Sequence, residues 1–339
     1  MVDSEGHRLW LHQASSDPSK SVEFYGASAT ANGGVLLCGS EDTAPGYRHA
    51  AGADHQREHN SLLLRLAKDG SEISLQRLSM APPTENIFLL LQRVVHWGTG
   101  FAVVGLSYDF SSSDPPIQFK TFITILKLDR DGKIEWRNNY PSKKDNIDSF
   151  AWPVVMADGS LVIAGDRIFK TVLLRVAQDG KLLARASFEE PYSLVTPARP
   201  ESHIELVSDR SEGRMLVRMD ENLHVESRTK LPFVGIDIKR TLRTADGGLA
   251  LFGRQLGTSG GPALAYLENG QSVAALALSD EKAITIGFSD AEPMMDSTTF
   301  AAVHAADYRS YVAADGRVAN EHGKEELVLS LIKVSRQDN

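Results

Sequence analysis

The sequence predicts an all-β fold, a six-bladed β-propeller with four-stranded antiparallel blades. One phrase recurs along the 339 residues: a short apolar strand ending in glycine, a second apolar strand, then Asp-Gly and a third strand. Repeats of several tens of residues that consist only of strands are typical of propellers and arrays. No long apolar pattern of period 3.6 interrupts the strands, which argues against a helical repeat.

The residue that ends the first strand of each phrase aligns the repeats. Clear copies end at Gly39, Gly105, Gly165 and Gly253. The gap between the last two leaves room for a degenerate copy at Ile204–Ser208, and a final copy follows at Phe300–His304. One domain, residues 1–339, then holds blades at residues 22–79, 86–140, 148–188, 193–231, 236–278 and 284–339.

The two ends of the chain predict how the propeller closes. The last copy stops at Asn339, before an Asp-Gly turn and a fourth strand. Near the other end, Arg8–Leu11 resembles Ile134–Arg137, which follows such a turn in the second repeat. We therefore expect the N-terminal strand, residues 8–14, to complete the last blade, which leaves no unpaired sheet edge.

The three strands of each phrase are taken as the second, third and fourth strands of a blade. The turns between the third and fourth strands of a blade carry Asp-Gly, the dipeptide favoured in tight hairpins whose two central residues both have positive φ. In the second repeat the turn belongs to Leu126-Lys-Leu-Asp-Arg-Asp-Gly132, followed by Trp136. This resembles a bacterial β-propeller repeat of the pattern Asp-Gly-Gly, apolar run, Gly, Leu-x-Lys-Leu-Asp-x-Asp-Gly, Trp. The resemblance covers the whole chain and implies the fold, but no activity, because one fold hosts unrelated functions.

Composition narrows the classes of partner. The chain has 36 Lys and Arg against 44 Asp and Glu, a formal net charge of −8, which argues against a general nucleic-acid binder. No apolar run is long enough for a transmembrane helix. Cys38, the single cysteine, allows no internal disulfide and is expected to be a small buried hydrophobe. The N-terminus lacks a secretion signal, although Met1 could replace a removed leader, so periplasm and cytoplasm both stay open.

The connections between the second and third strands are predicted to be long, at residues 40–61, 106–121, 254–262 and 305–327. In an antiparallel meander they all project from one face, opposite the Asp-Gly turns, and long loops in compact domains are usually functional or mobile. Aromatic residues and Arg, which are enriched at interface hot spots, occur in or beside these loops. The predicted partner-binding residues are Tyr47, Arg48, Tyr108, Phe110, Phe119, Trp152, Tyr308 and Tyr311. In the alternative reading, these side chains only fix each loop to its blade.

Two short motifs suggest catalysis but lack its structural context. His55-Gln-Arg-Glu-His59 matches the His-x-x-Glu-His pattern of zinc peptidases, in which His55, Glu58 and His59 would act. That chemistry needs a helix to hold the ligands, and the flanking segments are too short, so a solvated loop is favoured over a zinc site. Gly257–Gly261 reads Gly-x-Ser-x-Gly, but Pro262 and a strand follow instead of the required helix.

A basic residue recurs at one position of the third strand. Its members are Arg65, Lys127, Arg175, Arg218 and Lys333, and Tyr266 takes this position in the fifth blade. Such a ring of cations could bind an anion. The repeat itself favours a structural role, in which each cation pairs with the carboxylate of the following turn or covers a neighbouring blade.

Taken together, the sequence favours a monomeric, non-catalytic scaffold that binds another protein through the long loops and needs no cofactor. A bacterial envelope component or a toxin-neutralising, immunity-type partner would fit. The alternative is a six-bladed hydrolase or lactonase with calcium in the central channel. Polar residues at or near the starts of first strands would then supply the ligands, namely Glu85, Asn86, Asn146, Asp148 and Asp237.

Overall fold

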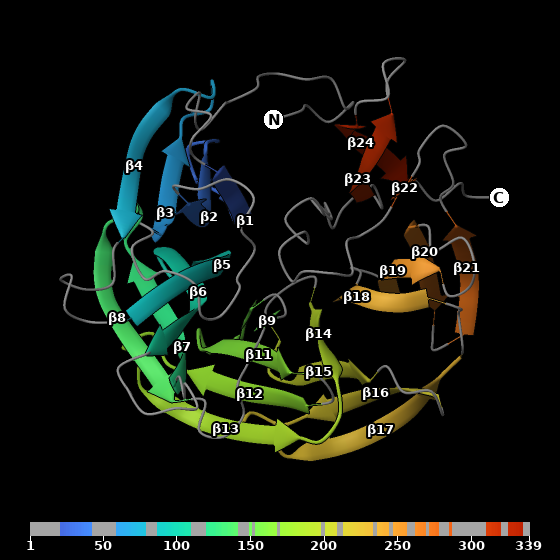
Figure 1. The fold of residues 1–339 in the computed structure, drawn as a ribbon. Helices are drawn as coiled ribbons and strands as arrows, with labels where there is room; N and C mark the ends of the chain where they lie inside the picture. Colours follow the sequence, from blue (N-terminus) through green and yellow to red (C-terminus); the bar gives the residue numbers. More distant parts are fainter. Residues whose placement is uncertain are drawn as a thin grey trace, which may run out of the picture. The chain divides into compact units, whose positions relative to one another are not determined.

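The computed structural model describes residues 21–42, 59–78, 87–109, 120–141, 149–150, 153–167, 170–197, 201–208, 213–232, 236–243, 247–255, 262–268, 271–277, 285–286, 310–319 and 325–334. These residues form strands and turns and contain no helix, so the all-β prediction is confirmed. The described part of the chain therefore offers no apolar helix that could span a membrane. The chain divides into two compact units, residues 1–150 and 151–339, which are described separately. Figure 1 labels the strands of each.

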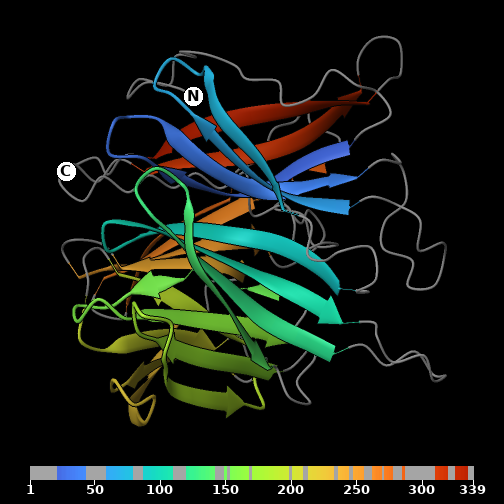
Figure 2. The ribbon, with the colours of Figure 1, turned by 90° about the vertical axis from the view of Figure 1, so that its left-hand side faces the viewer.

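The first unit holds two four-stranded antiparallel sheets, each with its strands in chain order, as predicted for blades. We call the strands of a blade A to D. Blade 1 consists of β1 (Ser21–Ala29), β2 (Val35–Asp42), β3 (His59–Leu66) and β4 (Glu72–Leu78). Blade 2 consists of β5 (Ile87–Trp97), β6 (Gly100–Asp109), β7 (Lys120–Leu128) and β8 (Ile134–Pro141). The described hairpin turns of both blades lie at the same end of the sheets (Figure 2), and β9 (Ser149–Phe150) follows.

The second unit continues the meander. Blade 3 runs through β10 (Val154–Val155), β11 (Leu161–Arg167), β12 (Lys170–Val176) and β13 (Leu182–Phe188). Blade 4 contains β14 (Tyr192–Thr196), β15 (Ile204–Ser208), β16 (Arg214–Met219) and β17 (Val225–Leu231). Blade 5 contains β18 (Ile236–Arg243), β19 (Leu249–Gln255), β20 (Pro262–Glu268) and β21 (Gln271–Ala277). The last sheet holds β22 (Thr285–Ile286), β23 (Ser310–Ala319) and β24 (Glu325–Val334).

Blades 4 and 5 share one sheet. Their A strands, β14 and β18, pair in parallel through Val195 with Thr241 and Thr196 with Leu242. The result is an eight-stranded sheet that ends in the two D strands, β17 and β21. The backbone hydrogen bonds of blade 4 therefore continue directly into blade 5.

The C–D turns have one geometry. The N–H of Ala67 donates to the carbonyl of Ser71 at 2.8 Å, and matching bonds close the turns at Asp129–Lys133, Ala177–Lys181 and Asp220–His224. Among their residues only the fourth has positive φ: Gly70, Gly132, Gly180 and, in blade 4, Leu223 with φ 65°. The expected turn with two positive-φ residues is therefore wrong, and the Asp before each glycine keeps negative φ. The turns instead follow the longer hairpin pattern that places one left-handed residue before a bulge.

The repeat glycine, predicted to end the B strand, lies within it, and for Gly105 its steric cause is clear. The A strand beside it contains a β-bulge in blades 1, 2 and 5, where one extra residue interrupts the ladder next to Gly39, Gly105 and Gly253. A Cβ placed on Gly105 would lie 2.3 Å from the carbonyl oxygen of Leu90, which is far inside van der Waals contact. Glycine is therefore needed where the bulged strand approaches. The extra residues are Tyr25, Gln92 and Lys239.

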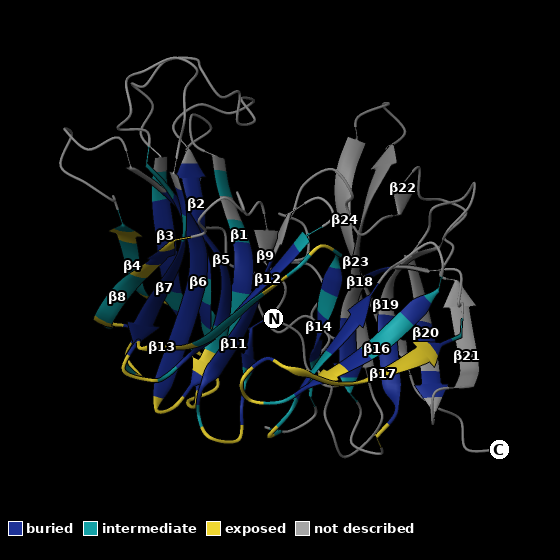
Figure 3. Ribbon diagram, turned by 90° about the horizontal axis from the view of Figure 1, so that it is seen from below, coloured by how far each residue is buried: buried dark blue, intermediate teal, exposed yellow. Residues whose placement is uncertain are grey.

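Apolar side chains pack between successive blades. In the first unit, residues of blades 1 and 2 form one buried cluster that includes Leu36, Leu63, Phe101, Val103 and Leu126. In the second unit, blades 3 and 4 enclose Val162, Leu173, Leu206, Val217 and Leu223, and blades 4 and 5 enclose Val207, Leu231, Leu249 and Leu251. B and C strands such as β6 and β12 are buried along most of their length, whereas β17 is exposed (Figure 3).

The predicted long connections need correction. The strands extend further than expected, because β2 ends at Asp42, β3 begins at His59, and residues 110–119 alone separate β6 from β7. The predicted loop at 305–327 is wrong, since β23 occupies Ser310–Ala319 and pairs with β24 along its whole length. The predicted strands at residues 8–14 and 300–304 lie outside the described residues.

Candidate functional site

The structure describes few of the predicted site residues. Tyr108 lies near the end of β6, half-buried, with Phe88 and Thr121 as its cross-strand neighbours. Tyr311 lies in β23 rather than in a loop, paired with Lys333. Outside the described residues lie Tyr47, Arg48, Phe110, Phe119, Trp152 and Tyr308, together with His55 and Glu58. His59 is the first residue of β3, opposite Asp42, so the motif does not lie wholly in a loop.

Tyr108 marks the B–C end of blades 1 and 2, the end from which residues 43–58 and 110–119 leave the sheets. A group of buried hydroxyls, here called the hydroxyl cluster, lies in the part of these blades nearest that end. Its members are Tyr25, Ser40, Ser61, Ser107 and Thr124. Because a buried hydroxyl without a partner is costly, each forms a hydrogen bond.

The bonds of the hydroxyl cluster join strands and blades. The hydroxyls of Tyr25 and Ser40 lie 2.8 Å apart, and those of Ser107 and Thr124 lie 2.6 Å apart. Ser61 donates across the blade boundary to the carbonyl of Leu89 at 2.6 Å. The strand ends that carry the two connections are therefore held in place by polar contacts.

A buried carboxylate adds an ion pair at the same end. Glu41, near the end of β2, has a side chain 2% exposed, and Arg77 of β4, 47% exposed, binds it. Arg77 donates from Nε to Oε2 at 2.7 Å and from Nη2 to Oε1 at 3.2 Å. The Glu41 hydrogen bond raises the pKa of Arg77. This two-point contact ties the outermost strand to the strand that enters the 43–58 connection.

The bulges of blades 1 and 2 meet at a buried arginine. Arg93 donates from Nη1 to the carbonyl of Tyr25 at 3.2 Å and to that of Gln92 at 3.1 Å, so one guanidinium serves both extra residues. Gln92 itself is 2% exposed, and among the described residues neither its side-chain nitrogen nor its oxygen finds a hydrogen-bond partner. Leaving a buried amide unpaired costs about 1–3 kcal/mol.

The cysteine in this region is not set up for nucleophilic chemistry. Burial raises the pKa of the Cys38 thiol to about 12, and the opposing effect of the nearby Arg93 charge is smaller. In the hydroxyl cluster, Ser61 donates to a backbone carbonyl, and Thr124, beside Ser107, also donates to Asn139 Oδ1 at 2.9 Å. In the described part of the chain no three His, Cys, Asp or Glu side chains gather as a metal site would require.

The recurring cations of the C strands are engaged in bonds wherever their side chains are described. Arg65 binds the backbone carbonyl of Asp131 at 3.0 Å and its carboxylate at 3.4 Å, so it reaches blade 2 and not Asp69 in its own turn. Lys127 donates to the carbonyl of Leu128 at 3.0 Å. These contacts match the structural interpretation of the repeat and leave no open ring of cations among the described residues.

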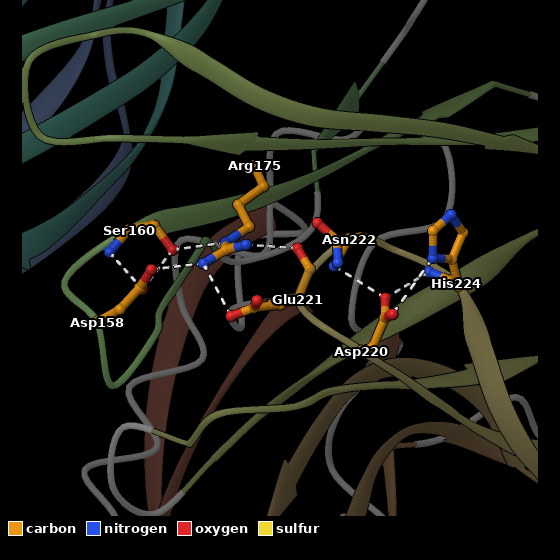
Figure 4. A network of polar contacts seen from close by, with 7 residues as sticks. All are labelled: Asp158, Ser160, Arg175, Asp220, Glu221, Asn222 and His224. Atoms are coloured by element: carbon orange, nitrogen blue, oxygen red, sulfur yellow. Dashed lines mark hydrogen bonds and ion pairs between the residues drawn. The ribbon is translucent and has the colours of Figure 1, made fainter.

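Arg175 is the most connected of these cations (Figure 4). It donates from Nε to the Ser160 hydroxyl at 2.9 Å and from Nη2 to the Asp158 carboxylate at 2.5 Å, both in the A–B turn of its own blade. Its Nη1 donates to the carbonyl of Glu221 at 2.5 Å, in the C–D turn of blade 4. Burial alone would raise the pKa of Asp158, but hydrogen bonds from Ser160 and Arg175 outweigh it and lower that pKa.

A second contact joins blades 4 and 5. Arg243 donates to the Glu205 carboxylate from Nε at 2.9 Å and to the carbonyl of Gly247 from Nη1 at 2.8 Å. Sequence reasoning missed this pair, as it missed Glu41 with Arg77 and Gln92 with Arg93. For the last pair a signal was present, since Gln92-Arg93 interrupts the apolar run of Ile87–Trp97.

Comparison with known proteins identifies the fold. No protein-family model and no curated protein matches the chain. A protein of unknown function from Dyadobacter fermentans aligns with a TM-score of 0.55 at 14% identity, over 94% of this chain and 96% of that one. The NanB sialidase from Streptococcus pneumoniae aligns with a TM-score of 0.56 at 10% identity, over 99% of this chain and 72% of that one.

The fold is a β-propeller. The β-propeller domain of the Trilobed protease from Pyrococcus furiosus is also similar, with a TM-score of 0.48 at 11% identity, over 93% of this chain and 86% of that one. At these identities the likeness concerns the fold alone. The activities named for these proteins are therefore not carried over to this chain.

Proposed function

We propose that the chain is a non-catalytic propeller that binds another protein through the B–C connections. The observation that carries the proposal is the difference between the two ends of blades 1 and 2. At one end, five-residue turns such as Ala67–Ser71 join the strands. At the other, residues 43–58 and 110–119 connect strands whose ends the hydroxyl cluster and the Glu41–Arg77 pair hold. Variable loops on a rigid scaffold are the usual carriers of recognition.

The test compares the two ends with charge substitutions. We expect Tyr47→Lys, Tyr108→Lys and Tyr308→Lys together to abolish capture of a partner, because aromatic anchors dominate interface energies. The matched control is Lys68→Glu, Lys133→Glu and Lys181→Glu, at exposed positions beside the turns. The assay is a quantitative pull-down with both variants and the wild type, with circular dichroism to confirm folding. Loss of the partner in the lysine-to-glutamate variant, and its retention in the tyrosine variant, would contradict the proposal.

We also propose that the propeller has six blades and closes through the N-terminal strand. Leu62, Leu64 and Leu66 of β3 are each 1% exposed. Leu63 packs between blades 1 and 2, so by strand alternation these three leucines point to the opposite face of blade 1. A closed ring would supply the cover that this apolar face needs. Deleting residues 1–14 should then lower the melting temperature, and an unchanged melting curve would count against closure.

The calcium-dependent hydrolase differs from this proposal in one measurable respect. Its candidate ligands Glu85, Asn86, Asn146 and Asp148 lie outside the described residues, and Asp237 lies on β18. A metal analysis of the purified protein separates the two. A stoichiometric calcium or zinc would favour the hydrolase over the binding scaffold.

A further inference from the structure

In blades 1 to 4 the C–D hairpin contains a bulge directly beside the recurring cation, whereas in blade 5 the bulge follows Tyr266. In blade 1 the ladder passes from Arg65–Ser74 to Leu66–Glu72, which leaves one extra residue on β4. The same irregularity follows Lys127, Arg175 and Arg218. The extra residues of blades 1 to 4 are Ile73, Glu135, Leu183 and Glu226. They alternate between apolar and acidic from one blade to the next.

In the blades whose bulged residue is a glutamate, the cation pairs with that glutamate in its own blade. Lys127 Nζ lies 3.5 Å from Glu135 Oε2. Arg218 Nε lies 3.4 Å from Glu226 Oε2. Both glutamates belong to the D strand of the same blade as their cation. The bulge brings the carboxylate to the position where it can meet the side chain on strand C.

In the blades with an apolar bulge the cation reaches the next blade. Ile73 and Leu183 are 46% and 43% exposed and offer no acceptor. Arg65 accordingly binds the carbonyl of Asp131 in blade 2. Arg175 binds the carbonyl of Glu221 in blade 4. The planar fork of arginine allows Arg175 to hold its own A–B turn and the neighbouring C–D turn at once.

We propose that the bulged residue of the D strand decides where the cation of its blade binds: an apolar residue directs the cation to the C–D turn of the next blade, and a glutamate keeps it within its own. A carboxylate beside the cation competes for the same N–H donors, and a charged acceptor is stronger than a backbone carbonyl. The residues at positions 73 and 183 thus act as positioning residues for links between blades 1 and 2 and between blades 3 and 4.

Amide hydrogen exchange in the turn of blade 4 tests the link. The amides of Asn222 and His224 donate to the Asp220 carboxylate within this turn. Arg175→Ala should speed their exchange about tenfold, which corresponds to the loss of one hydrogen bond to a charged group. Leu183→Glu should speed it similarly although Arg175 remains, because the new carboxylate draws the guanidinium away from Glu221.

Two controls keep the result specific. Leu183→Gln introduces a polar side chain of the same length as glutamate without its charge, and should leave the exchange unchanged. Lys170→Ala removes the exposed pair with Glu189, which involves neither Arg175 nor the C–D turn of blade 4, and should also be silent. Wild-type exchange rates in Leu183→Glu, or equal acceleration in Leu183→Gln, would overturn the rule.

The first unit gives an independent test if a blade 3 variant fails to fold. There Ile73→Glu should redirect Arg65 and speed exchange of the Asp131 and Lys133 amides, which donate to the Asp129 carboxylate. Ile73→Gln is the matched control. Unchanged rates in folded Ile73→Glu would overturn the rule as well.

Discussion

Leu223→Gly would relieve the backbone strain of a left-handed leucine but would also remove a buried side chain. Leu223 holds the turn position that is glycine in blades 1 to 3, and its φ of 65° lies in the left-handed region. That conformation costs a leucine about 1–2 kcal/mol, which glycine would avoid. The side chain, however, is only 4% exposed and packs with Val217 and Met219 between blades 3 and 4.

Burial should win. Truncating a core leucine costs about 2–5 kcal/mol, and glycine loses roughly 0.5–1 kcal/mol more in conformational entropy. After subtracting the relieved strain, we expect Leu223→Gly to lower the free energy of unfolding by roughly 0.5–5 kcal/mol, with the centre of that range at about 3 kcal/mol. Urea denaturation followed by tryptophan fluorescence measures this as a lower midpoint with an unchanged slope.

Gly132→Ala in blade 2 measures the cost of the left-handed backbone without a change in buried side-chain packing. Gly132 has a φ of +81°, and an added Cβ would meet only Leu36 Cδ1 at 3.9 Å, which is ordinary contact. This variant should therefore lose only about 1 kcal/mol, the cost of the left-handed backbone. A Leu223→Gly protein as stable as the wild type, or more stable, would refute the reasoning that side-chain burial fixes leucine in this turn.

Three further predictions concern buried or charged groups. Gln92→Met, which keeps the length of the side chain and removes its unpaired amide, should raise the free energy of unfolding by about 1 kcal/mol; a decrease would mean that the amide has a partner in solution. Cys38 should react with a thiol reagent at pH 8 only after denaturation, because its thiol is buried and its pKa is about 12; fast labelling of the folded protein would contradict this. Because the folded-state pKa of Asp158 is lowered, its contribution to stability is present above its unfolded pKa and is lost as the pH falls through the folded value. Acid titration of Asp158→Asn should therefore show a smaller loss of stability below about pH 4 than the wild type, and equal losses would speak against the Arg175 contact.

The sequence located the repeated features whose residue types are unusual. Gly105 marked its B strand because no side chain fits beside the bulge there, and the glycine repeated at the matching position of other copies leaves a visible pattern. The Asp-Gly dipeptides marked the C–D turns for a similar reason. Leu223 gave no such sign, since its position in the turn depends on packing against blade 3, which a sequence does not display.

Other parts depended on contacts distant in the chain. Asp315-Gly316 has the composition of a turn, yet both residues lie in β23, paired with Leu329 and Val328. Pairing along the whole length of β24 outweighs the local preference, and the loop predicted at 305–327 was therefore wrong. The Glu41–Arg77 pair spans two strands of blade 1, so neither residue stands out until the register is known.

The parallel pairing of β14 with β18 makes blades 4 and 5 a single module for protein engineering. A version of the chain ending after Leu231 would retain blade 4 but strip Val195 and Thr196 of their partners Thr241 and Leu242. β14, which lies inside the eight-stranded sheet of the full chain, would then become an edge strand with unpaired backbone groups. Truncated variants intended for study of blades 3 to 5 should therefore end after Ala277, and circular permutants should keep β14 and β18 on the same side of the cut.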